Sequence, residues 1–223
     1  MDLTLVIPAK LEKESLPQVL RELKKYNYKC IIVLEKNDTE TIQAINNFDC
    51  EILYQKNLGY GSALIEGINA TTTKYFCIFN ADGSFKPEEI KGMMQELIHN
   101  KFDYVFGSRY QKGSKSDDDT LVTLVGNYFF TFFGKIFFNL NITDILYTFV
   151  IGKTESAKKL NLKQKDFTFC VELPIKAKRL NQKMTSYTSH ERSRIAGSKK
   201  VNAFKDGFYI LIYLFKIFFR KEK

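Results

Sequence analysis

The sequence contains no tryptophan, four prolines, two histidines and four cysteines among its 223 residues. The histidines, His99 and His190, are not at metal-ligand spacing from each other. The cysteines form no CxxC pair and no cluster with histidine, which argues against structural zinc and favours reduced thiols, as in a cytosolic protein. These cysteines are Cys30, Cys50, Cys77 and Cys170.

The sequence also lacks an uninterrupted apolar run of the roughly 20 residues that a membrane-spanning helix needs. Lys135 interrupts the aromatic stretch at 128–138, and Lys216 interrupts a second one at 201–219. The N-terminus has neither the basic start nor the long apolar core of a signal peptide. We therefore predict no spanning helix and no signal peptide.

The residues that are present are those of a folded protein: 44% are apolar and 26% are charged. There are 34 Lys and Arg against 25 Asp and Glu, which gives a formal net charge of +9. This composition excludes a disordered or collagen-like chain. The length suits one large α/β domain, or such a domain with a short appendage.

Strand and helix patterns alternate through the first hundred residues. Short apolar runs predict strands, and apolar residues at helical spacing predict helices. Such an alternation implies a mainly parallel sheet covered on both faces, with ligands at the carboxyl ends of its strands. The predicted strands are 3–8, 30–34, 51–54, 75–80 and 104–106, and the predicted helices are 15–26, 39–47, 60–70 and 87–100.

The second half of the chain is less regular. A polar stretch at 111–120 predicts a mobile surface loop, and residues 183–189 predict a strand that is followed by a basic segment. Three helices are predicted, at 122–139, at 166–180 and in the apolar pattern that runs through 201–219.

Asp82 follows the fourth predicted strand in the tetrapeptide Asn80-Ala81-Asp82-Gly83. Its carboxylate is therefore expected on the ligand side of the sheet, where it can hold Mg²⁺ or Mn²⁺ against a diphosphate. An ordinary turn sequence without a ligand is the alternative.

Two other segments follow predicted strands. In the segment from Asn57 to Ala63, Gly59 and Gly61 open a helix, where the backbone can approach a phosphate or sugar closely, although a plain tight turn explains them equally well. Arg109 follows the fifth strand, where an arginine can bind phosphate or orient a carboxylate, unless it is a surface residue without such a role.

The basic segment that follows residue 190 places four cations within nine residues, which suits a phosphate-bearing ligand. A solvated basic stretch is the alternative. Glu172 lies in a predicted helix among apolar neighbours and is a candidate general base, or a helix carboxylate without a chemical role.

Taken in order, these segments resemble the family 2 glycosyltransferases, and among them the dolichyl- or polyprenyl-phosphate sugar transferases. The resemblance covers roughly residues 1–200 and rests on the order of the motifs rather than on any one of them. The segments are Val6–Glu12 for V-I-P-x-x-N-E, Asn57–Ala63 for N-x-G-x-G-x-A, Asn80–Asp82 for D-A-D, Pro87-Glu88 for P-E, Gly107–Arg109 for G-S-R, and Arg194–Lys199 for R-x-x-G-x-S-K with one residue fewer.

The resemblance implies a three-layer α/β/α nucleotide-diphospho-sugar transferase fold (GT-A, Rossmann-like) with a mainly parallel central sheet. It implies an inverting, metal-dependent hexosyltransferase that uses a UDP- or GDP-sugar, with Mg²⁺ or Mn²⁺ on Asp82. Asp82, Glu172 and Arg109 are the expected catalytic residues. The expected nucleotide-sugar site comprises Pro8, Ala9, Glu12, Glu35, Asn57, Gly59, Gly61, Asn80 and Ala81.

The expected acceptor is a polyprenyl (dolichyl-type) phosphate at a membrane surface. Its phosphate is already anionic at neutral pH and needs no strong base, so basic side chains suffice to position it. If the acceptor is instead a sugar hydroxyl in polysaccharide or glycolipid synthesis, a base is required, and Glu172 is the candidate. The residues expected at an acceptor phosphate are Arg192, Arg194, Ser198 and Lys199.

Three departures from the family pattern stand out. Asn80 replaces the first aspartate of D-A-D and removes one negative charge from the expected metal site. The segment 35–38 reads E-K-N-D where the family has D-D-G-S. The motif D-x-x-S-G-F-R keeps its aspartate as Asp144 but has Val150 where its arginine would stand, so Arg192 and Arg194 must do more, or the acceptor differs.

We expect a catalytic domain at 1–200 and an amphipathic aromatic and basic helix at 201–223. Such a helix can lie in a lipid interface and be attracted to anionic headgroups. This predicts a cytoplasmic protein bound peripherally and reversibly at the cytoplasmic face of the membrane. Burial of the two aromatic helices against each other, or a homodimer contact, is the alternative.

Three rival functions remain. A nucleotidyltransferase should carry a glycine-rich loop after its first strand, and residues 8–11 (P-A-K-L) are not one. Nucleic-acid binding would explain the net charge, but the aromatic residues have apolar neighbours, which suits core or lipid better than base stacking. A non-catalytic relative that binds a nucleotide sugar is conceivable because of Asn80.

Overall fold

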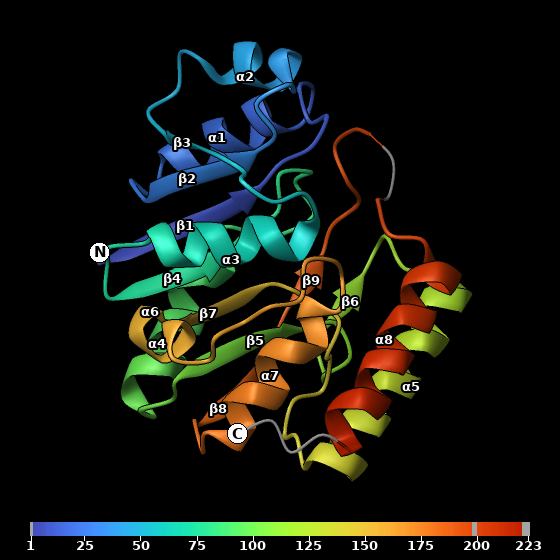
Figure 1. The fold of residues 1–223 in the computed structure, drawn as a ribbon. Coiled ribbons are helices and arrows are strands. Elements are labelled where there is room, and N and C mark those ends of the chain that lie inside the picture. Colours follow the sequence, from blue (N-terminus) through green and yellow to red (C-terminus); the bar gives the residue numbers. More distant parts are fainter. Residues whose placement is uncertain (1, 198–199, 220–223) are drawn as a thin grey trace.

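The structure is a computed structural model that describes residues 2–197 and 200–219 (Figure 1). Seven strands make up its central sheet, in the order β3-β2-β1-β4-β7-β5-β8. Every neighbouring pair is parallel except the two that involve β7, which is antiparallel to β4 and to β5. The strands are β1 (Leu3–Pro8), β2 (Lys29–Leu34), β3 (Glu51–Tyr54), β4 (Tyr75–Ile78), β5 (Tyr104–Ser108), β7 (Val150–Lys153) and β8 (Met184–Thr188).

Helices cover both faces of this sheet, as the alternating sequence pattern predicts. Successive strand side chains enter different cores: Ile31 and Val33 belong to one apolar cluster, and Ile32 and Leu34 to the other. Strands buried on both faces must be apolar throughout, which explains their short continuous apolar runs. One face carries α1 (Leu16–Lys24), α2 (Thr39–Ile45) and α4 (Glu89–His99), and the other carries α3 (Tyr60–Ala70), α6 (Thr154–Lys158) and α7 (Phe169–Arg179).

Four short elements are absent from the sequence prediction. The strand β7 and the helix α6 follow directly on the segment that contains the motif aspartate Asp144. Two two-residue strands, β6 (Lys115–Ser116) and β9 (His190–Glu191), pair in parallel and join the polar stretch at 111–120 to the basic segment. Such pairings unite residues far apart in sequence, so no local pattern indicates them.

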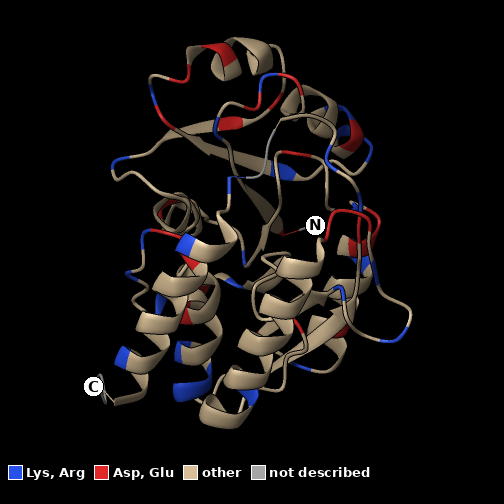
Figure 2. Ribbon diagram, turned by 90° about the vertical axis from the view of Figure 1, so that its right-hand side faces the viewer, with Lys and Arg blue, Asp and Glu red and all other residues tan. Residues whose placement is uncertain are grey.

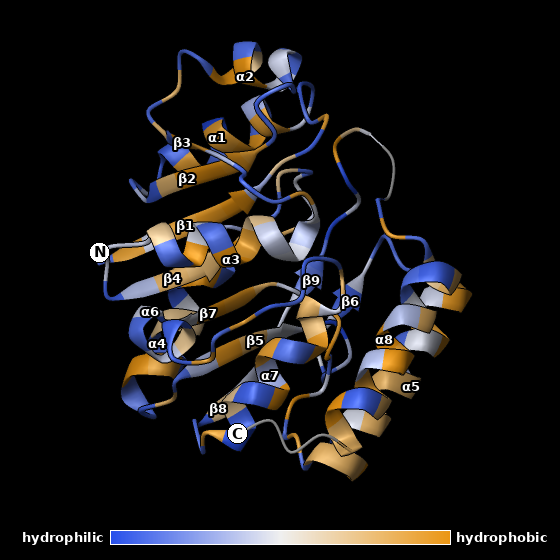
Figure 3. Cartoon of the chain, viewed as in Figure 1, coloured by the Kyte–Doolittle hydropathy of each residue, from blue (hydrophilic) through white to orange (hydrophobic). Residues whose placement is uncertain are grey.

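Two long helices, α5 (Leu121–Phe138) and α8 (Ala203–Phe219), lie side by side beyond one end of the sheet and run in the same direction (Figure 1). They meet through aromatic contacts: the ring centroids of Phe133 and Phe215 are 5.9 Å apart, and those of Phe137 and Phe218 are 5.5 Å apart. Figure 3 colours α5 mostly as hydrophobic, and α8 as hydrophobic with blue bands at its charged positions.

The burial of these two helices is partial. Each helix has three buried residues: Ile210, Leu214 and Ile217 in α8, and Asn127, Phe130 and Gly134 in α5. Among the described helices, α5 is the one that is long and apolar enough to cross a membrane by length and composition alone. The single charge of Lys135 therefore does not prevent α5 from meeting the length and composition criteria for a membrane-spanning helix. This corrects the expectation from the sequence.

Candidate functional site

A cavity of about 560 Å³ opens at the carboxyl ends of the strands, the location that a mainly parallel sheet predicts. Segments that follow β1, β2, β4 and β5 all contribute to its wall, because parallel strands end at the same edge. Ten of the residues expected at the site from the sequence line this cavity: Pro8, Ala9, Glu12, Glu35, Gly59, Asn80, Ala81, Asp82, Arg109 and Arg194.

Four other expected residues that the structure describes do not line it: Asn57, Gly61, Glu172 and Arg192. Gly61 packs α3 against another loop: a Cβ at Gly61 would lie 2.2 Å from the carbonyl oxygen of Gln164. Asn57 is also turned away, since its backbone and side-chain N–H groups donate to the carboxylate of Glu66. Both residues shape the loops behind the cavity. Ser198 and Lys199 lie outside the described residues.

The candidate base Glu172 is not brought to the cavity. Its side chain is completely buried in α7, where it accepts backbone N–H bonds from Lys163 at 2.9 Å and Gln164 at 2.8 Å. Lys176, one turn further along the helix, forms a 2.8 Å ion pair with it. The observed role of Glu172 is therefore to fix the loop before α7.

Arg192 also points away from the cavity. Its guanidinium donates to the carboxylate of Glu22 on α1, at 2.9 Å, and to the carbonyl oxygen of Phe85, at 2.8 Å. Of the two arginines expected at an acceptor phosphate, the structure brings only Arg194 into the cavity.

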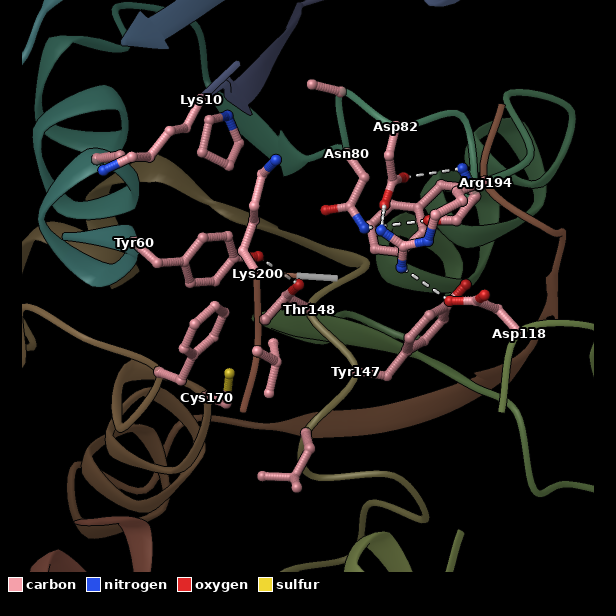
Figure 4. Close-up of a pocket in the computed structure, with 18 of the residues that line it drawn as sticks. Lys10, Tyr60, Asn80, Asp82, Asp118, Tyr147, Thr148, Cys170, Arg194 and Lys200 are labelled. Atoms are coloured by element: carbon pink, nitrogen blue, oxygen red, sulfur yellow. Dashed lines mark hydrogen bonds and ion pairs between the residues drawn. The ribbon is translucent and has the colours of Figure 1, made fainter. Parts of the chain in front are cut away.

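The side chains of Asp82 and Arg194 both line the cavity and point toward each other (Figure 4). One oxygen of Asp82, Oδ1, accepts the backbone N–H of Ser84 at 3.0 Å, and the other, Oδ2, lies 3.7 Å from Nη1 of Arg194. The second arm of the guanidinium donates to Asp118 at 2.8 Å. Burial lowers the pKa of Arg194, but the hydrogen bond to Asp118 and the charge of Asp82 outweigh it and raise that pKa.

The backbone beside Arg194 is fixed to the turn that carries Asp82. The N–H of Ile195 donates to the carbonyl of Asp82, and that of Arg192 donates to the carbonyl of Ser84, both at 2.8 Å. Gly83 has a φ of +82°, and a Cβ there would lie 2.4 Å from the Ile195 side chain. The glycine of this turn therefore permits both its left-handed conformation and the close approach of the basic segment.

The end of the cavity near β1 and β2 carries two further ion pairs. Lys10 donates to Glu35 at 2.8 Å, and Lys200 lies 3.8 Å from Glu12. Burial raises the pKa of Glu12, an effect that the hydrogen bond from Ser15 and the charge of Lys200 oppose.

Arg109 is held by carboxylates rather than open to a ligand. Two of its nitrogens donate to Asp144, at 2.7 and 3.0 Å, and Nη1 donates to Glu191 at 3.2 Å. Nη1 also lies 3.6 Å from Asp119, and the guanidinium lies 4.6 Å from the ring centroid of Tyr147.

Charge and burial compete in this network. Burial lowers the pKa of Arg109, but the charge of Asp144 and the hydrogen bonds to it hold that pKa well above its ordinary value. Burial raises the pKa of Glu191, against the opposing charge of Arg109. Because a buried arginine needs such partners, Arg109 organises the cavity wall in the structure described here.

Sequence reasoning missed an aromatic and hydroxyl wall. Tyr60 stacks on Phe167 with ring centroids 4.7 Å apart, and its hydroxyl shares a 2.7 Å hydrogen bond with Thr148. Cys170 lies beside them, and burial raises its thiol pKa to about 12, which leaves it unreactive at neutral pH. The motif N-x-G-x-G-x-A contains Tyr60 at a variable position, so no sequence signal marks it.

The stretch expected to be a mobile loop also contributes to the site. Asp118 and Asp119 line the cavity, together with Thr123 and Asn127 from the first half of α5. Three consecutive acidic residues were the available signal, but their partners, Arg194 and Arg109, are distant in the sequence.

The expected divalent cation can be tested against the donor atoms. Among residues 2–197 and 200–219, no group of three or more His, Cys, Asp or Glu side chains could hold a metal. Asp82 nevertheless offers a carboxylate oxygen, and the side-chain amide oxygen of Asn80 points into the cavity (Figure 4). Mg²⁺ characteristically takes one or two protein oxygens and completes its shell with water and phosphate. The residues present fit such a partial site.

The cavity lies where the resemblance to nucleotide-sugar transferases implies a site, and sequence comparison gives the family. A profile described as Glycosyl transferase family 2 matches residues 4–160, which is more than half of the chain. The protein belongs to this family of enzymes, as the order of its motifs predicts.

Relatives with known activities include two archaeal enzymes. The chain is 25% identical to a UDP-N-acetylglucosamine–dolichyl-phosphate N-acetylglucosaminyltransferase from Methanococcus voltae, over 94% of each chain. It is 28% identical to a dolichol-phosphate mannosyltransferase from Pyrococcus furiosus, over 53% of this chain and 36% of that one. An uncharacterized protein from Methanocaldococcus jannaschii is 26% identical over 95% of this chain and 91% of its own length.

Solved structures confirm the predicted fold. Glucosyl-3-phosphoglycerate synthase from Mycobacterium tuberculosis, solved with Mn²⁺, UDP and glucosyl-3-phosphoglycerate, superposes with a TM-score of 0.70 at 12% identity, covering 96% of this chain and 78% of that one. Mannosyl-3-phosphoglycerate synthase from Rubrobacter xylanophilus gives a TM-score of 0.67 at 13% identity, with coverages of 96% and 72%. At these identities the likeness establishes the GT-A fold.

Proposed function

We propose that the protein transfers a hexose, with inversion, from a nucleotide sugar to a polyprenyl phosphate at a membrane surface. One observation carries this proposal. A single cavity joins the carboxyl ends of the strands, where Asp82 lies, to residues of α5 and to Val201 just before α8. A water-soluble donor and the phosphate of a lipid can therefore meet in the same space, beside two helices with apolar outer surfaces.

The donor would bind at the β1, β2 and β4 end of this cavity. Pro8, Ala9, Glu12 and Glu35 would surround the nucleoside, and the diphosphate would lie near Asp82. A divalent cation held by Asp82 and Asn80 would neutralise the charge that develops on the departing nucleoside diphosphate. The structures of glucosyl-3-phosphoglycerate synthase with Mn²⁺ and UDP or UDP-glucose support this part of the proposal, as does the UDP-sugar enzyme of Methanococcus voltae.

The acceptor phosphate would bind at Arg194. The position of Glu172 supports a phosphate over a sugar hydroxyl, because the base expected for a hydroxyl acceptor lies outside the cavity. Two relatives whose names include a dolichyl or dolichol phosphate add to this support. Ser198 and Lys199 keep their expected role at this phosphate, as a proposal from the sequence.

The helices α5 and α8 would rest on the membrane. They carry fourteen exposed large apolar side chains, and Phe204, Phe208 and Phe132 are between 62% and 80% exposed. In Figure 2 the helices are mainly tan, with isolated basic positions. Lys135 and the two lysines of α8 outnumber its one aspartate, which favours anionic headgroups. A homodimer contact through the same surface is the second candidate.

A lipid-transfer assay tests the proposal. The protein is incubated with radiolabelled UDP-N-acetylglucosamine, UDP-glucose or GDP-mannose, together with a polyprenyl phosphate and Mn²⁺, and label is measured in the organic phase. The proposal expects label with one donor, and no label when the unphosphorylated polyprenol replaces the phosphate. Asp82→Asn should lower the rate by roughly two to three orders of magnitude, the cost of losing one electrostatic contact in a transition state. Transfer to a water-soluble glycan alone would contradict the proposal.

A further inference from the structure

Arg194 occupies the position from which a cation would approach Asp82. The turn already uses one oxygen of Asp82, since Oδ1 accepts the Ser84 N–H at 3.0 Å. The remaining oxygen, Oδ2, has Nη1 of Arg194 at 3.7 Å (Figure 4). A divalent cation that binds Oδ2 directly must therefore take the space and the charge that Arg194 now supplies.

The charges around Asp82 favour such an exchange. Asp82 and Asp118 both interact with the guanidinium of Arg194, and Glu12 lies near Lys200. A divalent cation at Asp82 would replace the positive charge that this carboxylate loses when the guanidinium leaves it. An anionic phosphate alone would add to the negative charge there, so cation and phosphate should enter together.

The guanidinium can leave Asp82 without moving the backbone. The hydrogen bonds of Ile195 and Arg192 to the turn hold the main chain on both sides of Arg194. The side chain is 21% exposed, and its contact with Asp82 is longer than its 2.8 Å hydrogen bond to Asp118. A side-chain rotation therefore suffices to break the weaker contact.

We propose that Arg194 is an exchangeable counterion of Asp82. A divalent cation, arriving with the donor diphosphate, displaces the guanidinium, which then binds the phosphate of the acceptor. This inference rests on the proposed function and adds an order to it: donor and cation bind first and make Arg194 available to the second substrate. Arg194 in this way links the two substrates.

Mn²⁺ binding without any nucleotide tests the exchange. Free Mn²⁺ is measured by electron paramagnetic resonance in titrations of the wild type, Arg194→Gln, Arg194→Lys and Arg192→Gln. Removing the competing charge should tighten Mn²⁺ binding by about tenfold in Arg194→Gln. Arg194→Lys, which keeps the charge, should stay close to the wild type.

Arg192→Gln is the matched control. It removes the same charge two residues away, from a side chain that is bound to Glu22 outside the cavity. Its Mn²⁺ affinity should stay within about twofold of the wild type, because long-range surface charge is screened. Equal affinities of wild type and Arg194→Gln would overturn the proposal, as would equal effects of the Arg192 and Arg194 substitutions. Circular dichroism verifies that each variant is folded.

A second titration measures the link between the substrates, with farnesyl phosphate as the acceptor probe. Mn²⁺ plus UDP or GDP should tighten its binding to the wild type by about fivefold, and this gain should vanish in Arg194→Gln. No gain in the wild type would overturn the proposed order.

The two proposals can fail separately. If the wild type transfers sugar to polyprenyl phosphate but its Mn²⁺ affinity equals that of Arg194→Gln, only the exchange is wrong. If Arg194→Gln binds Mn²⁺ tighter but no lipid is glycosylated, the exchange stands and the proposed acceptor is wrong.

Discussion

The chain up to residue 108 and the chain after it both line one cavity, yet they are stabilised in different ways. The first part contains β1 to β5 and the helices between them, and its apolar side chains enter the two cores on either side of the sheet. The second part contributes Arg109 with its three carboxylates, and the two aromatic helices, whose outer surfaces are exposed. The apolar faces predicted in the first part are therefore buried in a core, whereas the apolar outer faces of α5 and α8 in the second part are exposed.

The cause of this difference is what each kind of interaction requires of its partner. In the first part, an apolar helix face packs on any apolar surface, as α3 does on β1 and β2 much earlier in the chain, so a local pattern indicates both the element and its buried face. In the second part, Arg109 needs partners from 35 and 82 residues further along the chain. Such a site depends on the whole fold to bring its members together.

The strongest test of this comparison removes a partner of Arg109. Asp144→Ala leaves a buried guanidinium without its bidentate partner and should lower the free energy of unfolding by about 3–5 kcal/mol. Urea denaturation measures the change. The exposed pair of Lys10 and Glu35 in the first part is the control, and Lys10→Ala should cost less than about 1 kcal/mol. Similar losses in both variants would show that burial does not distinguish the two regions.

A second test addresses the exposed aromatic surface. Replacing Phe132 and Phe208 together by Ser should weaken binding to anionic vesicles by at least about a hundredfold, since burying each such side chain contributes roughly 1.5–3 kcal/mol. The stability of the protein in solution should change little, because both side chains are exposed. Flotation with vesicles and thermal denaturation measure the two effects. A change in sedimentation with unaltered vesicle binding would instead support a homodimer surface.

A third test uses two glycines in helices. Gly61→Ala in α3 would place a Cβ 2.2 Å from the Gln164 carbonyl and 2.7 Å from that of Asp166, and we expect a loss of about 2 kcal/mol. Gly126 in α5 has no atom within 4 Å of such a Cβ. Gly126→Ala should therefore stabilise the protein by about 0.5–1 kcal/mol through helix propensity. Urea denaturation measures both changes. If the two substitutions changed the free energy of unfolding in the same direction, the contrast between a packed and an exposed helix would be contradicted.

The smallest effect concerns pH and Asp103, the residue just before β5. Burial raises the pKa of Asp103, but its hydrogen bonds from Lys153 and from the backbone of Lys183 outweigh this and lower it. A carboxyl group whose pKa is lower in the folded state stabilises the fold above its unfolded value of about 4, and this stabilisation is lost as the pH falls through the folded value.

The wild type should consequently be more stable than Asp103→Asn at pH 7, and the difference should shrink below about pH 4. Urea denaturation of both proteins at several pH values measures it. A difference that grows on acidification would contradict the direction given for Asp103.

Sequence patterns predicted much of the sheet and, through the order of the motifs, ten of the cavity residues. The strand β7 was missed because four residues inserted antiparallel between β4 and β5 give no distinctive local pattern. Glu172 illustrates the opposite error. Its apolar neighbours fit either a buried base or a structural carboxylate, and only the packing of the 163–164 loop against it shows the second role.

Arg109 and Arg194 show why the remainder required the structure. Each arginine lies in a motif, so the sequence by itself determined that the cavity would contain both. Tertiary structure decided that Arg109 is enclosed by carboxylates whereas Arg194 lies over Asp82 within reach of a ligand. The physical reason is that local patterns determine which elements form and which faces are apolar, while the availability of a charge depends on which distant groups neutralise it.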